Sequence, residues 1–92
     1  MIRSFRSKAL KRFAESGDAS KLSVRNTQRV EIILRRLNAA KVPEHMNLPG
    51  LYFHALKGLE KGRYSVSVTG NFRMTFGWDG EDAIDVDSED YH

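Results

Sequence analysis

The chain contains no cysteine, and this absence excludes two ways of stabilising a small protein. It can form neither a disulfide framework nor a thiolate metal site, so hydrophobic packing has to hold the fold together. A length of 92 residues favours one compact domain over residues 1–92. Because a chain this short buries only about 60–65% of the surface that its unfolded form exposes, a bound partner could add to its stability.

Long hydrophobic runs are missing as well. Arginine and lysine residues interrupt the start of the chain repeatedly, so it lacks the apolar stretch of a signal peptide. No later segment approaches the length of a membrane-spanning helix. We therefore expect a cytoplasmic protein with no membrane partner.

Charge is distributed unevenly along the chain, whose net charge is +3 at pH 7. Residues 1–50 carry eleven Lys or Arg and four Asp or Glu, a net charge of +7. Residues 51–92 carry four basic and eight acidic residues, a net charge of −4. The basic half could face phosphate, but basic residues also cover the outer faces of helices in many soluble proteins. Charge alone therefore does not identify RNA as a ligand.

The first half of the sequence predicts a short strand and two helices. Met1–Phe5 could form the strand, and a first helix is expected between Ser7, a suitable N-terminal cap, and Gly17, a natural stop. Its apolar residues fall on one face: Ala9, Leu10, Phe13 and Ala14. A second helix is expected to begin after Ser23 and to end before Pro43.

The second helix has an apolar stripe and a basic remainder. The stripe recurs every three or four residues: Val24, Thr27, Val30, Ile33, Leu34 and Leu37. Four arginines lie largely off it: Arg25, Arg29, Arg35 and Arg36. This basic outer surface could meet RNA or simply water.

Beyond a proline-containing connection at 42–50, the sequence predicts strands. Apolar and polar residues alternate through Tyr64–Trp78 on either side of Gly70-Asn71, which is typical of a β-hairpin with one apolar face. Leu51–Leu56 is expected to form the strand before this hairpin, and Ala83–Val86 a strand after it. The elements together predict an α+β fold, with the helices packed on an antiparallel meander.

Side-chain alternation places two polar residues on the other side of this sheet. His54 is out of phase with Leu51, Phe53 and Ala55, and Arg73 is out of phase with the apolar positions of its own strand. His54 and Arg73 are therefore predicted to share the surface that the helices do not cover. Taken alone, such a histidine is more often an ordinary surface residue than a catalyst.

Five short motifs are spread over nearly the full chain. They are Met1-Ile-Arg-Ser-Phe5, His54-Ala-Leu-Lys57-Gly58, Gly62-Arg-Tyr-Ser-Val-Ser-Val68, Asn71-Phe-Arg73-Met-Thr-Phe76 and Asp90-Tyr91-His92. As a set they resemble the HigB branch of the RelE toxin superfamily. The helical region between Ser16 and Asn47 contributes no motif to this resemblance.

The resemblance implies a RelE-like fold with two N-terminal helices packed on a small antiparallel sheet. It also implies a type II toxin that cleaves mRNA in the decoding site of the 70S ribosome without a cofactor. Its partner would be a helix-turn-helix, HigA-like antitoxin. Six positions correspond to functional residues of the family: His54, Lys57, Arg73, Asp90, Tyr91 and His92.

These residue types suit RNA cleavage without a metal ion. The reaction needs a base for the ribose 2′-hydroxyl proton, cationic groups for the phosphorane, and an acid for the departing 5′-oxygen. His54 and His92 are candidates for base and acid because imidazole titrates near neutral pH. Asp90 could instead be the base or could orient an imidazole, so these roles stay open.

The remaining three residues would hold the substrate. Lys57 and Arg73 would contact the scissile phosphate, and the planar guanidinium of Arg73 is suited to a forked contact. Tyr91 could stack on a base and hold the nucleotide while the 2′-hydroxyl aligns with the leaving oxygen. Singly, Lys57 would more often be a solvated turn residue and Tyr91 a packing residue.

Other functions are less well supported. The histidines lack the spacing of a helical zinc site, His45 lies in the proline-bounded connection, and the acidic stretch at 79–90 lacks the ligand pattern of an EF-hand. The main alternative is a non-catalytic toxin of the same scaffold that inhibits DNA gyrase, which would not need His54, Arg73 and the C-terminal motif to converge. A DNA-binding module would use the second helix, but the sequence has no helix-turn-helix pattern.

Overall fold

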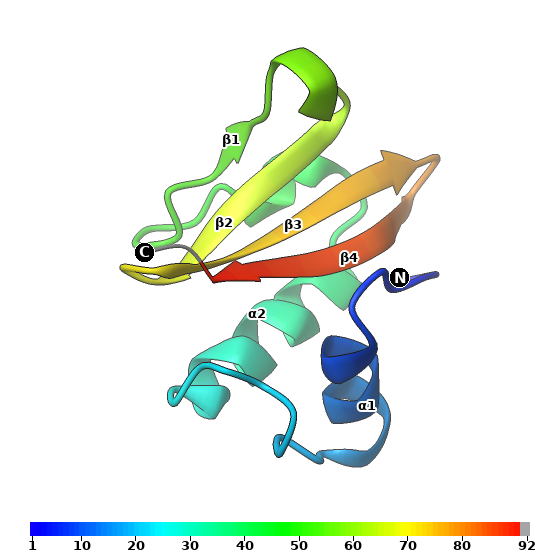
Figure 1. Ribbon diagram of the computed structural model, residues 1–92. Helices are drawn as coiled ribbons and strands as arrows, with labels where there is room; N and C mark the ends of the chain where they lie inside the picture. The colour runs from blue at the N-terminus through cyan, green and yellow to red at the C-terminus, as the bar shows by residue number, and fades with distance from the viewer. Residues whose placement is uncertain (91–92) are drawn as a thin grey trace.

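The computed structural model describes residues 1–90 and shows helices on one side of an antiparallel sheet (Figure 1). The helices are α1 (Lys8–Ser16) and α2 (Thr27–Ala39), with short 3₁₀ turns η1 (Pro43–Met46) and η2 (Gly58–Glu60). The strands are β1 (His54–Ala55), β2 (Arg63–Thr69), β3 (Phe72–Asp79) and β4 (Asp82–Asp90). They pair in chain order, each antiparallel to the next, which confirms the α+β class.

Both helices begin at a capping side chain. Ser7 Oγ accepts a hydrogen bond from Leu10 N–H at 3.2 Å, and Asn26 Oδ1 accepts one from Arg29 N–H at 3.1 Å. Each bond satisfies one of the N–H groups that a helix leaves free at its start. The cap at Asn26 explains why α2 begins at Thr27 and not directly after residue 23, as the apolar stripe had predicted.

The N-terminal segment does not form the continuous strand expected at Met1–Phe5. Its isolated parallel bridges to β4 are Ile2 with Ala83 and Phe5 with Val86. The ladder is interrupted at Asp85, which has a φ of 50° and whose N–H donates a hydrogen bond to Ser4 Oγ at 2.9 Å. The segment still lies along the outer edge of β4 and so covers part of a free sheet edge.

Two strands differ in length from the prediction. Only His54 and Ala55 of the expected strand at Leu51–Leu56 belong to β1, because Tyr52 has a φ of 51° and breaks the extended run. Strand β4 extends well beyond the predicted Ala83–Val86, to residue 90. Its pairing with β3 continues through acidic positions that show no apolar alternation.

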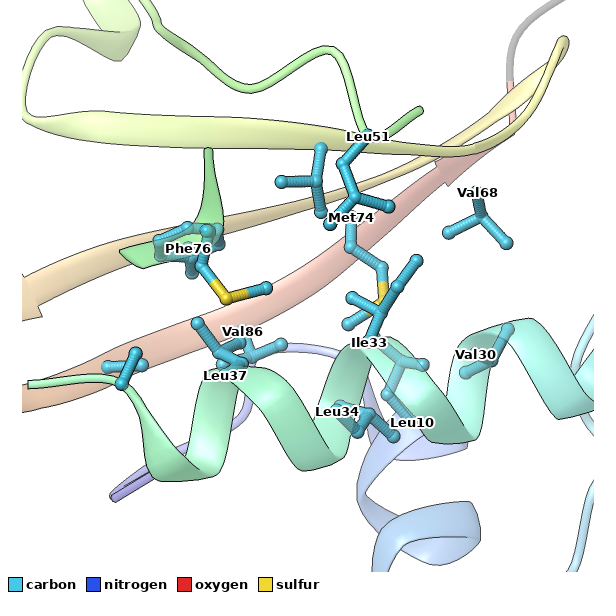
Figure 2. Packing of buried hydrophobic residues seen from close by; sticks show 14 of the residues in the cluster. Leu10, Val30, Ile33, Leu34, Leu37, Leu51, Val68, Met74, Phe76 and Val86 are labelled. Carbon is cyan, nitrogen blue, oxygen red and sulfur yellow. The ribbon is translucent and has the colours of Figure 1, made fainter. Parts of the chain in front are cut away.

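The apolar side of the sheet packs against the helices (Figure 2). Met74 and Phe76 from β3 are fully buried, as are Leu37 from α2 and Leu10 from α1. Burying one such side chain contributes roughly 1.5–3 kcal/mol, so this layer carries most of the stability. The predicted alternation of the hairpin is confirmed. Within residues 1–90, no helix has both the length and the apolarity needed to cross a membrane.

Candidate active site on the open face of the sheet

Strand register brings two of the predicted residues to one face. His54 is paired with Ser65, which is paired with Thr75; in the next row, Ser67 is paired with Arg73. Paired residues project to the same face, and the two rows are roughly 7 Å apart. His54 and Arg73 therefore share the side of the sheet that α1 and α2 do not cover (Figure 1), as alternation had predicted.

His54 carries an exposed imidazole whose orientation is set by the preceding main chain. Its Nδ1 lies 3.0 Å from the main-chain oxygen of Tyr52. Tyr52 presents that oxygen from a left-handed conformation, which costs a bulky residue on the order of 1 kcal/mol or more. The ring is thus directed by a hydrogen bond while its side chain remains accessible to a ligand.

Arg73 is held by an acidic residue of the neighbouring strand. Its Nε and Nη2 lie 2.8 and 2.6 Å from Glu89 Oε2. The side chains of Arg73 and Glu89 are 26% and 39% exposed, so the ion pair is partly solvated and contributes little to stability. Its main effect is to direct the guanidinium group. A phosphate bound here would share Arg73 with Glu89, a residue that had no predicted role.

A second arginine of this face is nearly buried. Arg63 is 9% exposed, and its Nη2 donates to Thr75 Oγ1 and to the main-chain oxygen of Asp85, each at 2.9 Å. Its Nε lies 3.5 Å from Glu60. Burial lowers the pKa of the Arg63 guanidinium from its ordinary value, and the charge of Arg6 acts in the same direction. The group stays cationic because arginine does not lose its proton in proteins.

Two strained residues support this face. Tyr52 and Asp85 are the non-glycine residues with positive φ in the described part of the chain. Each offers its main-chain oxygen to a basic side chain of the open face, Tyr52 to His54 and Asp85 to Arg63. Arg63 had a sequence signal, since it shares the phase of the polar positions in β2. Nothing local to Tyr52 predicts a left-handed conformation.

Lys57 and Asp90 lie at opposite ends of the sheet. Lys57 is exposed and leads into η2, at the end where β2 begins. Asp90 closes β4 and is paired with Phe72, at the end where β3 begins. The two residues are roughly 15–20 Å apart along the strand direction. Alternation also directs the Asp90 side chain to the face of Phe72, away from that of Arg73.

The described residues therefore place His54 and Arg73 on one face, on strands separated by β2, with Lys57 at one end of the sheet and Asp90 at the other. Tyr91 and His92 lie outside the described residues. Within residues 1–90, no group of three or more histidine or acidic side chains is arranged to hold a metal ion. What remains is an exposed imidazole and an ion-paired guanidinium on the same face, groups that can transfer a proton and bind a phosphate.

Comparison with known proteins decides the family. The model of the HigB-like toxin family, described as the RelE-like toxin of the type II toxin–antitoxin system HigB, matches residues 3–92. The chain belongs to the HigB-like toxin family. This HigB-like toxin is 34% identical over 92 residues to the endoribonuclease HigB of Proteus vulgaris, and the match covers 100% of both chains. Membership of a type II toxin–antitoxin family implies an antitoxin partner.

The fold of this HigB-like toxin also has a counterpart among solved structures. The crystal structure of a YafQ mutant from E. coli matches with a TM-score of 0.59 and 13% identity. The match covers 98% of this chain and 93% of that one. At so low an identity the likeness supports the fold alone, and it confirms the RelE-like architecture that the motifs had implied.

Proposed function

We propose that this HigB-like toxin is a ribosome-dependent endoribonuclease that cleaves mRNA in the decoding site of the 70S ribosome and so inhibits translation. One observation carries the proposal: His54 and the partly exposed Arg73 lie on one open face of a chain that is 34% identical, over its full length, to a protein named an endoribonuclease. In the cell we expect a cytoplasmic toxin, neutralised by a helix-turn-helix, HigA-like antitoxin.

The proposed reaction is an attack by the RNA on itself. A base removes the proton of a ribose 2′-hydroxyl, and the 2′-oxygen forms a bond to the adjacent phosphorus. The bond from phosphorus to the 5′-oxygen breaks, and an acid gives that oxygen a proton. The products are a 2′,3′-cyclic phosphate and a 5′-hydroxyl. His54, Asp90 and His92 are the candidates for base and acid, each worth about 10²–10⁴-fold in rate.

Cationic and aromatic groups would hold the substrate for this reaction. Arg73, already directed by Glu89, would contact the scissile phosphate, and Lys57 would contact the RNA at the margin of the face. Tyr91 would stack on a base. An open sheet offers few groups that could align an RNA strand by themselves. The ribosome would supply that alignment, which is the reason for proposing ribosome dependence.

Primer extension on a defined mRNA in a purified translation system tests the proposal. The arms are the native chain, His54→Ala, His92→Ala and the native chain without ribosomes. His45→Ala serves as a matched control, because His45 belongs to η1 and not to the open face. We expect cleavage within codons in the native and control arms only. Intact mRNA during active translation would overturn the proposal, and a gyrase supercoiling assay would then test the alternative.

A further inference from the structure

In both histidines within residues 1–90 the ring nitrogen Nδ1 makes a hydrogen bond, but it donates in His54 and accepts in His45. His54 Nδ1 lies 3.0 Å from the main-chain oxygen of Tyr52. A carbonyl oxygen can only accept, so this Nδ1 has to carry the proton. His45 Nδ1 lies 3.1 Å from the main-chain nitrogen of Lys41, which donates. In neutral His45 the proton therefore sits on Nε2.

The acceptor for His54 is built into the backbone. Tyr52 has a φ of 51°, and its side chain is 78% exposed, so packing of the ring does not account for this conformation. On either side the chain is fixed to β2: the Leu51 oxygen accepts a hydrogen bond from Ser67 N–H at 2.7 Å, and His54 pairs with Ser65. The left-handed residue lies between these two attachments and presents its oxygen to the imidazole.

We propose that the main-chain carbonyl of Tyr52 holds His54 in the Nδ1–H tautomer, which makes Nε2 of His54 the atom that accepts the 2′-hydroxyl proton. The assignment of His54 as base rests on the proposed function, whereas the tautomer does not. Among residues 1–90, no hydrogen bond engages Nε2 of this exposed side chain, so Nε2 is open to a ligand. Tyr52 is then a positioning residue that acts through its backbone.

The proton balance of the step follows from this assignment. The 2′-hydroxyl proton moves to Nε2 as the bond from the 2′-oxygen to phosphorus forms. His54 becomes an imidazolium, and its Nδ1–H bond to the Tyr52 oxygen strengthens because the donor is now charged. The bond from phosphorus to the 5′-oxygen breaks, and His92, as an imidazolium, supplies the proton for that oxygen.

Nitrogen NMR of the isolated chain tests the tautomer without any cleavage assay. Long-range ¹H–¹⁵N correlation spectra would be recorded at about pH 8, well above the ordinary imidazole pKa of about 6.5. His54→Gln and His45→Gln assign the signals. We expect a pyrrole-like Nδ1 and a pyridine-like Nε2 for His54, and the reverse for His45. A pyridine-like Nδ1 in His54 would overturn the proposal.

Two substitutions at position 52 test the role of the backbone. Asn tolerates the left-handed conformation, whereas the β-branched side chain of Val disfavours it. Tyr52→Asn should keep the Nδ1–H signature, and Tyr52→Val should shift His54 toward the other tautomer and reduce cleavage about tenfold or more. Equal spectra for the two variants would overturn the role of Tyr52. If His54 shows the Nδ1–H tautomer but the chain cleaves no mRNA, the assignment of His54 as base and the proposed function are both overturned. The role of Tyr52 in fixing the tautomer would still stand.

Discussion

The two faces of the sheet are formed by the same strands but are built differently. On the helix side, Val66, Met74 and Phe76 are fully buried among apolar neighbours. On the open side, Ser65 and Thr75 are each only 2% exposed, yet they are polar. Burial of a polar group on the open side is satisfied at Thr75 by a hydrogen bond within the protein, which its hydroxyl accepts from Arg63. Apolar packing should thus determine stability on one face, whereas fixed polar geometry should determine activity on the other.

The largest effect on stability is expected from Phe76→Ala on the helix side. Phe76 is fully buried, so its removal deletes a large apolar side chain and leaves a cavity. We expect the free energy of unfolding to fall by about 3–5 kcal/mol, measured by urea denaturation followed by circular dichroism. Ile32→Ala, at a side chain 55% exposed, is the control and should cost less than about 1 kcal/mol. Equal losses for both would contradict a close-packed layer.

On the open face, Arg73→Ala should reduce cleavage strongly and change stability little, whereas Phe76→Ala mainly reduces stability. Removing the guanidinium should slow mRNA cleavage about a hundredfold or more, because the charge that develops on the phosphate loses a donor. The free energy of unfolding should change by less than about 1 kcal/mol, since the ion pair with Glu89 is partly solvated. Primer extension and urea denaturation measure the two effects. An unchanged cleavage rate would refute the proposed role of Arg73.

Glu89→Gln is the matched variant for Arg73. It keeps the size of the Glu89 side chain and removes its negative charge, so a phosphate would no longer compete with the Glu89 carboxylate for Arg73. We expect cleavage to be retained or increased. A loss of cleavage as large as that of Arg73→Ala would instead show that the carboxylate itself is required.

Thr75→Val is expected to reduce stability, although Thr75 lies on the open face and not on the helix side. Its hydroxyl accepts from the nearly buried Arg63 at 2.9 Å, so valine would leave a charged donor without one of its acceptors. Stability should fall by about 1–2 kcal/mol although the site lies on the open face. Thr75→Ser keeps the hydroxyl and should cost clearly less. If both substitutions cost the same, methyl packing and not the hydrogen bond would explain the loss.

The sequence predicted the elements that local patterns encode. Both helices and the hairpin followed from apolar periods of 3.6 and 2, and the same alternation put His54 and Arg73 on one face. These patterns succeed because neighbouring residues in each element bury the same side. Strand ends were predicted less well. Tyr52 shortens β1 and Asp85 interrupts the N-terminal pairing, each through a positive φ that depends on distant contacts.

The candidate site was predictable only in part for the same reason. Glu89 meets Arg73 through the register of β4, and Arg63 donates a hydrogen bond to the main-chain oxygen of Asp85, 22 residues away. Neither contact can be read from local sequence. Lys57 and Asp90 entered the prediction through the family resemblance; the structure places Lys57 at one end of the sheet, and alternation directs Asp90 at the other end away from the face of Arg73. Their proposed roles therefore depend on how an RNA strand spans the sheet.

The smallest effect is expected at a contact that belongs to neither face. Glu31 and Arg35 pair one helical turn apart on α2, with Oε1 2.6 Å from Nη2 and side chains 58% and 74% exposed. Exposed pairs of this kind contribute about 0.3–0.5 kcal/mol, because water screens the charges and both long side chains lose freedom. A double-mutant cycle of Glu31→Gln and Arg35→Gln, measured by urea denaturation, should give a coupling energy in that range. Cleavage should not change. A coupling above about 1 kcal/mol would mean that an exposed ion pair stabilises the fold nearly as much as the buried hydrogen bond of Thr75, and the contrast between buried and solvated polar groups would fail.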